Sequence, residues 1–289
     1  MIYHCEDHTC NYWDEGEKLP ERCPQCGRKL LRANEADMTG DDWTALGNTI
    51  WDAEASDKKR MVDCFRKAAY LGSAWGVCNL GICMEQGNGV EADPVQAFWL
   101  YQQAVEMGSL NAVCCLGVCY EYGDGVEQNW ERAVHWFREA AESGVSVAMA
   151  DLGYCYEKGC GVEQSWEQAF SWYRRGAECG NLQSMHNLGY CYEKGCGVEQ
   201  SWEQAFSWYR RVAECGYPVS MSNLGLCYKR GYGVEQNLQE AIKWYEQGAQ
   251  YGDLQSMHNL ARCYERGEGV EQNEERAFYW YRRSAEGGN

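Results

Sequence analysis

Apolar residues recur along most of the chain at helical spacing, and this pattern repeats with a longer period of 36 residues. A leucine followed three residues later by cysteine marks each period: Leu80, Leu116, Leu152, Leu188, Leu224 and Leu260. Six such units fill residues 73–288. A fixed period of this length is typical of helical solenoids, in which each unit buries its apolar face only against its neighbours.

Each unit reads as two helices, and the fourth shows this most clearly. Asn181 is a good N-cap for a first helix, in which apolar residues around Leu188 recur on one face. The glycine-rich segment at Gly195 ends that helix, and Ser201 caps a second one that ends at Gly216. Good N-caps occupy the place of Ser201 in the other units: Asp93, Asn129, Ser165, Asn237 and Asn273.

The repeated pattern A-x-x-x-L-G-x-x-Y-x-x-G-x-G-V, followed by a capped helix with A-x-x-W-Y, resembles the Sel-1-like repeat, a relative of the tetratricopeptide repeat. The resemblance covers about three quarters of the chain. It implies an all-α fold, a right-handed α/α superhelical solenoid with a concave inner surface. It also implies a role as a scaffold or adaptor.

Three regions follow from these patterns. Residues 1–33 differ in kind from the repeats and are predicted to form a small separate module. Residues 34–72 read as a linker and a degenerate helical pair, because Trp43 and Leu46 keep the pattern but the glycine loop is missing. We interpret this pair as an N-terminal cap. Residues 73–289 hold the six repeats.

The N-terminal module carries two short cysteine pairs, Cys5 with Cys10 and Cys23 with Cys26. Four sulfur or nitrogen ligands in two close pairs are typical of tetrahedral structural zinc. The Cys-Pro-x-Cys-Gly form of the second pair resembles a zinc ribbon of the rubredoxin-like kind. His8 is an alternative to Cys10, since Cys5-x-x-His8 has the commoner spacing. Iron, or free thiols without metal, are the remaining alternatives.

The other fourteen cysteines include six at one helical position: Cys83, Cys119, Cys155, Cys191, Cys227 and Cys263. Neighbouring helices lie roughly 8–10 Å apart, too far for a disulfide, so these residues are predicted to be small apolar contacts. The secreted branch of the resembling family joins neighbouring helices by disulfides. Here Cys179 and Cys215 have no cysteine opposite, which favours a reducing compartment. Cys160 and Cys196, between loop glycines, are predicted to be exposed and reactive.

Charge and hydropathy narrow the class of partner. The formal net charge of −17 disfavours binding to nucleic acid or to an anionic membrane. No apolar run approaches the roughly 18 residues of a membrane span, and the first residues do not read as a secretory signal. We therefore predict a cytoplasmic protein. Glutamates recur after each loop valine and at the end of most first helices, and this acidic edge would suit a basic partner.

A polar stripe on the first helices is the best candidate for binding. In the fourth unit Gln183, Asn187 and Tyr190 follow one another at helical spacing beside the core stripe. The matching candidates elsewhere are Asn79, Asp151, Tyr154, Asn223 and Asn259. Amides beside aromatic rings suit an extended peptide, because an amide both donates and accepts hydrogen bonds. The alternative is a polar row between helices. Trp130, Trp166 and Trp202 mark another edge, for partner contact or for packing on a neighbouring loop.

No enzyme motif is convincing. Ser56-x-x-Lys59 matches a short nucleophile motif, without its companion motifs and in an expected interhelical loop. His186 and His258 share one repeat position and are predicted to be surface residues. We predict a non-enzymatic scaffold that binds a protein or peptide. The alternatives are an enzyme-linked regulator using the zinc module or Ser56, and nucleic-acid contact through the ribbon, which has five Lys/Arg against six Asp/Glu.

Overall fold

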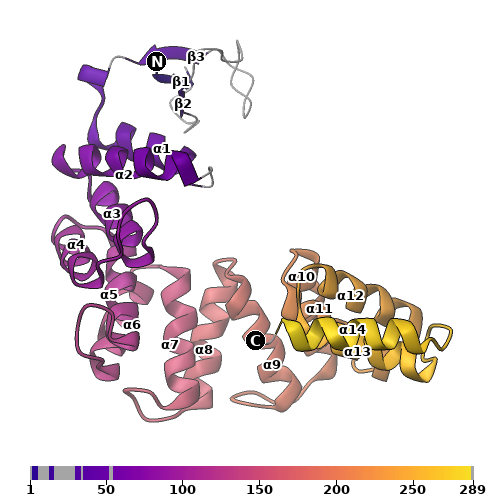
Figure 1. Cartoon of the computed structure of the whole chain (residues 1–289). Helices are drawn as coiled ribbons and strands as arrows, with labels where there is room; N and C mark the ends of the chain where they lie inside the picture. Colours follow the sequence, from indigo (N-terminus) through magenta and orange to yellow (C-terminus); the bar gives the residue numbers. More distant parts are fainter. Residues whose placement is uncertain (1, 6–12, 16–29, 34, 52–54, 288–289) are drawn as a thin grey trace. The chain divides into compact units, whose positions relative to one another are not determined.

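The computed structural model describes residues 2–5, 13–15, 30–33, 35–51 and 55–287. The chain divides into two compact units, Met1–Val145 and Ser146–Asn289, which are described separately below. Within each unit, consecutive helix pairs pack in chain order (Figure 1), which confirms the predicted helical solenoid.

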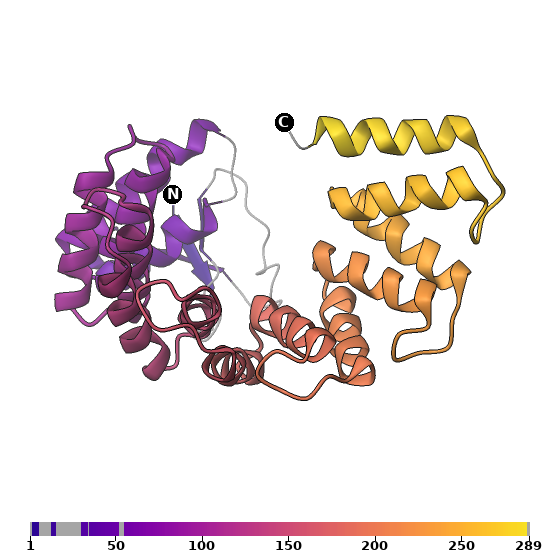
Figure 2. The same ribbon diagram turned by 90° about the horizontal axis from the view of Figure 1, so that it is seen from below.

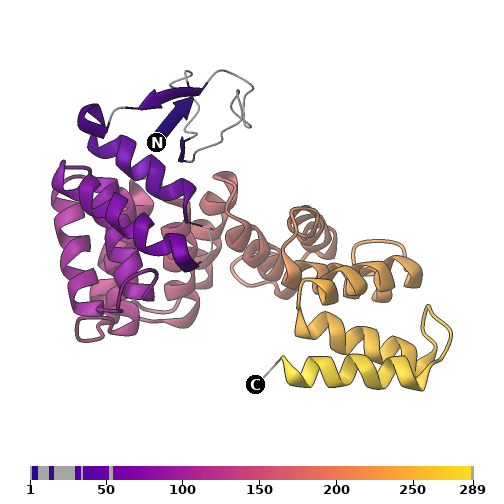
Figure 3. The same cartoon turned by 45° about the horizontal axis from the view of Figure 1, so that its top comes forward.

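The N-terminal unit begins with a three-stranded antiparallel sheet of order β2-β1-β3. Its strands are β1 (Ile2–Cys5), β2 (Trp13–Glu15) and β3 (Leu30–Ala33). A short 3-10 turn, Glu35–Asp37, leads into the predicted capping pair, α1 (Gly40–Thr49) and α2 (Ala55–Tyr70), which pack together (Figure 3). The first two repeats follow as α3 (Ala74–Gln86), α4 (Pro94–Glu106), α5 (Leu110–Tyr122) and α6 (Trp130–Glu142).

The C-terminal unit holds the other four repeats. Their helices are α7 (Ser146–Lys158), α8 (Trp166–Glu178), α9 (Leu182–Lys194), α10 (Trp202–Glu214), α11 (Pro218–Arg230), α12 (Leu238–Gln250), α13 (Leu254–Arg266) and α14 (Glu274–Glu286). Figure 2 shows the pairing well at the C-terminal end, where α13 and α14 lie side by side. We call the first helix of each repeat helix A and the second helix B.

The N-cap residues and loop glycines identified in the sequence begin and end the helices as predicted. Asn181 caps α9 by accepting a hydrogen bond from the amide of Ser184, and Ser201 caps α10 in the same way. Gly195 takes a left-handed conformation with φ of 71° at the end of α9. The Gln200 side chain then donates to the Glu193 carbonyl at 2.7 Å and closes the loop onto helix A.

Within a repeat, helices A and B meet at a glycine. An ideal Cβ on Gly189 would lie 2.6 Å from the ring of Tyr209, which is itself fully buried. The same contact recurs between Gly81 and Tyr101, Gly117 and Phe137, Gly153 and Tyr173, and Gly225 and Tyr245. In the first five repeats the glycine after the motif leucine therefore lets a large ring lie against helix A.

Successive repeats meet through the second loop glycine. A Cβ on Gly197 would lie 2.1 Å from the carbonyl oxygen of Trp166, the first residue of the preceding helix B. Gly233 has the same relation to Trp202. The loop of one repeat therefore lies directly on the start of helix B of the repeat before it.

The helix-A cysteines are packing residues. All six are at most 3% exposed, and the fourteen cysteines among the described residues are free thiols. Burial raises the pKa of Cys191 and of Cys227 to about 12. The prediction for the loop thiols is wrong in part: Cys160 and Cys196 are half-buried, whereas Cys179 and Cys215 at the ends of α8 and α10 are exposed.

Candidate binding surface

The predicted binding residues lie on helices A, and we call them the helix-A row. In the C-terminal unit the row consists of Asp151, Tyr154, Gln183, Asn187, Tyr190, Asn223 and Asn259. Tyr154 is 42% exposed and Tyr190 37%, and the remaining members are exposed or half-buried. In the N-terminal unit the row is represented by the half-buried Asn79 on α3.

Several amides of the row already have partners inside the protein. The Gln183 side chain donates to the Asn187 side chain at 3.1 Å. Asn259 donates to the Ser222 hydroxyl on the preceding helix A at 3.5 Å, and Asn79 donates to Asn48 at 2.8 Å. The alternative of a polar row between helices therefore holds for Asn259 and Asn79, whereas Gln183 and Asn187 bond with each other within α9. The rings of Tyr154 and Tyr190 remain open to a ligand.

Cations accompany the row in the C-terminal unit. The last turns of its four helices A carry Lys158, Lys194, Arg230 and Arg266. Lys158 lies 5.8 Å from the Tyr154 ring centroid, and Lys194 lies 5.9 Å from that of Tyr190. The last turns of α3 and α5 have no basic residue. Lys158 also pairs with Glu157 at 2.8 Å and Lys194 with Glu193 at 2.6 Å, so the exposed row is aromatic and these two cations are partly neutralised.

A second layer of polar contacts lies behind the row, and it was not predicted from the sequence. A helix-B tyrosine, fully buried in all of these repeats but the sixth, donates its hydroxyl to the glutamate near the end of helix A in the same repeat. The pairs are Tyr101 with Glu85, Tyr173 with Glu157, Tyr209 with Glu193, and Tyr281 with Glu265, at 2.8 to 3.1 Å. These glutamates, predicted above to belong to an acidic edge, instead hold the two helices of one repeat together. In each pair the tyrosine follows the glutamate by 16 residues, and this constant spacing is the sequence signal that could have predicted the hydrogen bond.

Two repeats depart from this link. In the second repeat Phe137 replaces the tyrosine, so Glu121 has no helix-B hydroxyl to accept from and pairs with Tyr122 instead. In the fifth, Lys229 replaces the glutamate, and the buried Tyr245 hydroxyl has no hydrogen-bond partner among the described residues. The fifth repeat therefore keeps a buried donor without its acceptor.

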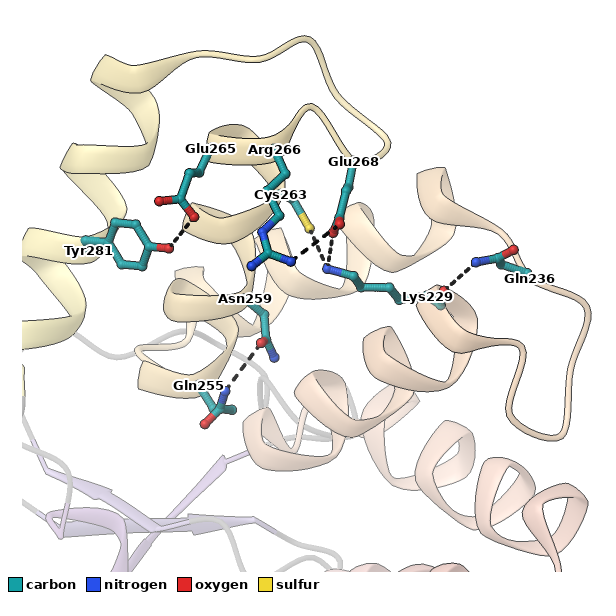
Figure 4. Close-up of polar contacts among 9 residues, drawn as sticks. All are labelled: Lys229, Gln236, Gln255, Asn259, Cys263, Glu265, Arg266, Glu268 and Tyr281. Carbon is teal, nitrogen blue, oxygen red and sulfur yellow. Dashed lines mark hydrogen bonds and ion pairs between the residues drawn. The ribbon is translucent and has the colours of Figure 1, made fainter.

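Lys229 bends toward the sixth repeat instead (Figure 4). Its ammonium lies 2.5 Å from the Glu268 carboxylate and 3.8 Å from the Cys263 sulfur. Arg266 approaches the same carboxylate at 3.9 Å. The hydrogen bond from Lys229, with the charges of Arg266 and Arg262, lowers the pKa of Glu268.

The two histidines at one repeat position differ. His258 is exposed, as predicted, but His186 is half-buried between the rings of Tyr209 and Tyr217. Its Nδ1 lies 2.8 Å from the Ser220 hydroxyl on the next helix A. Burial lowers the pKa of His186 to about 4. The prediction of a surface residue is therefore wrong for His186, which links two helices.

The tryptophan edge is mainly a packing edge. Trp202 is half-buried and stacks on Tyr232 in the loop of the next repeat, with ring centroids 4.0 Å apart. Trp166 lies 6.3 Å from Tyr190, also in the next repeat. For these two residues, packing on the neighbouring repeat explains their position in the sequence.

The remaining candidate chemistry concerns the N-terminal segments. Cys10, Cys23, Cys26 and His8 lie outside the described residues, and of Cys5 only the backbone in β1 is described. The described residues contain no group of three or more His, Cys, Asp or Glu side chains suited to a metal ion. Residues 56–59 lie in the first turn of α2 rather than in a loop, which corrects the expected position of Ser56 and Lys59.

The stacked pairs of 13-residue helices define an α-solenoid repeat protein. The sequence matches the Sel1 repeat family six times, over residues 76–109, 112–145, 146–181, 182–217, 218–253 and 254–289. The chain therefore belongs to the Sel1 repeat family. No curated protein matches the sequence. In the described part of the chain, no helix is both long enough and apolar enough to cross a membrane.

Solved structures agree with this assignment. The chain is 28% identical to a Sel1 repeat protein from Oxalobacter formigenes, with a TM-score of 0.74, covering 84% of this chain and 96% of that one. It is 31% identical to c5321, a protective antigen of uropathogenic Escherichia coli with an SLR fold, with a TM-score of 0.68 over 86% of this chain and 54% of that one. This chain thus spans about half of c5321. Yeast Tom70, at 13% identity and a TM-score of 0.53 over 89% of this chain and 55% of that one, shares the fold.

Proposed function

We propose that this protein is a non-enzymatic scaffold that binds a protein or peptide along the helix-A row. The observation that carries the proposal is the exposure of Tyr154 and Tyr190, at the same position in consecutive repeats of the C-terminal unit. Exposed aromatic side chains are large contact groups that lose little conformational entropy on binding. The amides beside them have the hydrogen-bonding capacity that an extended backbone requires.

A comparison of exposed tyrosines tests this proposal. Protein captured from cell extract by the full chain is quantified by mass spectrometry, and the captured species is then purified and titrated directly. Tyr154→Ser with Tyr190→Ser should weaken its binding at least tenfold. Tyr251→Ser, which removes a tyrosine that is 64% exposed outside the row, is the matched control. Equal binding by the row variant and the control would place the partner site elsewhere.

We also propose that the first 33 residues hold one structural zinc ion. The donor set Cys5, Cys10, Cys23 and Cys26, with His8 as the alternative to Cys10, has the chemistry that closed zinc sites use. Zinc would supply the stability that so short a segment does not obtain from an apolar core. Metal analysis should give one zinc per chain, lost in Cys23→Ser/Cys26→Ser. Full occupancy in that variant would contradict the site.

The proposed role needs no catalytic residue and no membrane anchor. The free thiols of the described repeats favour a reducing compartment, and we propose the cytoplasm. The exposed glutamates after each loop valine remain available to steer a basic segment of the partner toward the loops: Glu91, Glu127, Glu163, Glu199, Glu235 and Glu271.

A further inference from the structure

The fifth repeat contains a tyrosine hydroxyl, that of Tyr245, whose equivalents in other repeats donate a hydrogen bond to a glutamate. In four repeats a helix-B tyrosine donates to a carboxylate from the same repeat, and in three of them this tyrosine is fully buried. Tyr245 occupies the same place, is fully buried, and has no partner among the described residues. An unpaired buried hydroxyl destabilises the fold, so an acceptor that reached it would bind favourably.

The charges around this hydroxyl are mainly positive. Arg230 and Arg262 lie close enough to Tyr245 to lower its pKa, against the larger effect of burial. Lys229 and Arg266 share the Glu268 carboxylate. The carboxylate of Glu265 is occupied by the hydroxyl of Tyr281 (Figure 4). Glu268 is therefore the carboxylate that Lys229 and Arg266 share, and the Tyr245 hydroxyl is left without an acceptor among the described residues.

We propose that Tyr245 and Lys229, once the Lys229 side chain moves aside, bind the carboxylate of an aspartate or glutamate side chain from an extended peptide. This inference rests on the proposed function and names the chemistry of the partner at the fifth repeat. The other repeats show the arrangement that the ligand would reproduce: a carboxylate at the end of helix A, accepting from the tyrosine hydroxyl. Here the carboxylate is supplied by the partner, because Lys229 stands where the protein's own glutamate would be.

Lys229 is the group that must move. Its side chain reaches across to Glu268 and is only 13% exposed, while the Glu268 side chain is 33% exposed. An incoming carboxylate would compete with Glu268 for its ammonium, while Arg266 continues to pair with Glu268. Arg262 belongs to α13, one turn after Asn259 of the helix-A row, so a peptide lying along the row would pass beside this site.

The first test compares two fluorescent ten-residue peptides, one alternating serine and glutamate and the other alternating serine and glutamine. Anisotropy titrations use the full chain at low and at physiological salt. The glutamate peptide should bind at least tenfold more tightly. Equal affinities would overturn the proposal, because a carboxylate site must distinguish the charged side chain from its neutral isostere.

Two matched variants locate the site. Tyr245→Phe should weaken binding of the glutamate peptide roughly three- to tenfold, as expected for one lost hydrogen bond to a charged group. Tyr209→Phe removes a hydroxyl whose acceptor is Glu193 and should leave peptide binding unchanged. Unchanged affinity in Tyr245→Phe would show that the hydroxyl does not donate to the peptide carboxylate, and would refute the site.

A third variant fills the site from within. Lys229→Glu with Glu268→Tyr reproduces the residues found at Glu193 and Tyr232 one repeat earlier. Its own glutamate should accept from Tyr245, abolish binding of the glutamate peptide and raise the melting temperature. A variant that is folded and still binds the peptide would contradict the proposal.

The outcomes separate this inference from the proposed function. Loss of partner binding in Tyr154→Ser/Tyr190→Ser, together with failure of the peptide tests, would refute the carboxylate site alone. Peptide binding that depends on Tyr245, together with partner binding unaffected by the two row tyrosines, would refute the wider row and keep the site.

Discussion

The fourth and fifth repeats have nearly the same apolar frame and different polar interiors. Gly189 packs on Tyr209 as Gly225 packs on Tyr245, and both rings are fully buried. In the fourth repeat the hydroxyl meets Glu193, whereas in the fifth it meets no acceptor, because Lys229 turns toward Glu268. The apolar contacts therefore hold the repeats together, and one repeat differs from the next at its polar positions.

The contact between repeats teaches the same lesson on a smaller scale. Gly176 and Val212 are the single difference between residues 152–180 and 188–216. The Ser184 hydroxyl leans into the space beside Gly176 without a hydrogen-bond partner among the described residues. Beside Val212 that space is filled, and the equivalent Ser220 bonds with His186 instead. One side chain decides where a buried hydroxyl points.

The largest effect is expected where the two repeats agree. Gly189→Val and Gly225→Val each place atoms within about 2.6 Å of a buried tyrosine ring, so each should destabilise the protein by about 3 kcal/mol, the upper end for overpacking. Urea unfolding measures both. A loss in one repeat but not in the other would show that the frames are not equivalent.

The next effect concerns His186, whose position is occupied by Ser222 in the fifth repeat. Its pKa of about 4 in the folded state is below the ordinary value of 6.5. Below pH 6.5 the unfolded chain takes up a proton that the folded chain does not, so stability falls as pH drops toward 4. The loss at pH 5 should be about 2 kcal/mol.

Calorimetry at pH 7.5 and pH 5 of the wild type and of His186→Ser checks this sign. The variant should lose less stability over that interval than the wild type. An identical pH dependence would mean that His186 titrates normally in the folded protein. His258→Ser, at the exposed equivalent position, is the control.

A smaller difference should separate the two tyrosines. Tyr209→Phe should destabilise the protein by about 1.5 kcal/mol, because it removes a hydrogen bond to a carboxylate that is largely shielded from water. Tyr245→Phe should leave stability unchanged or raise it by up to about 1 kcal/mol, since it breaks no bond and removes a buried hydroxyl without a partner among the described residues. Thermal unfolding of both variants, side by side, measures the contrast. Equal losses would indicate an acceptor for Tyr245.

The smallest effect on stability is expected at the exposed thiols. Alkylation of the native protein should modify Cys179 and Cys215 first and leave the melting temperature unchanged, while Cys191 and Cys227 react only after unfolding. Peptide mapping by mass spectrometry gives the order. Early modification of Cys191 would mean that the helix-A contacts open readily.

The sequence predicted the helices of the repeats and their caps, because Asn181, Ser201 and Gly195 act on their own turns. It also predicted the buried cysteines, since a period of 36 residues distinguishes core from surface. It did not predict the partners of Glu193 or His186, because each partner lies on another helix and depends on side-chain direction. Cys196 was misplaced for a related reason: variation at its repeat position indicated solvent, but the neighbouring loop half-covers it.

The loop contact of Gly197 has an evolutionary consequence. The first, fourth and fifth repeats each carry both halves of that joint, a glycine that packs on the element before it and a helix-B carbonyl that receives the glycine of the repeat after it. Copying a whole block therefore copies a matched joint, and such an array can lengthen without new surfaces having to adapt. The pair of Lys229 and Glu268 does not share this freedom, because its halves differ. A block inserted between the fifth and sixth repeats would separate them, so the order of the last two repeats is the part of the array least open to rearrangement.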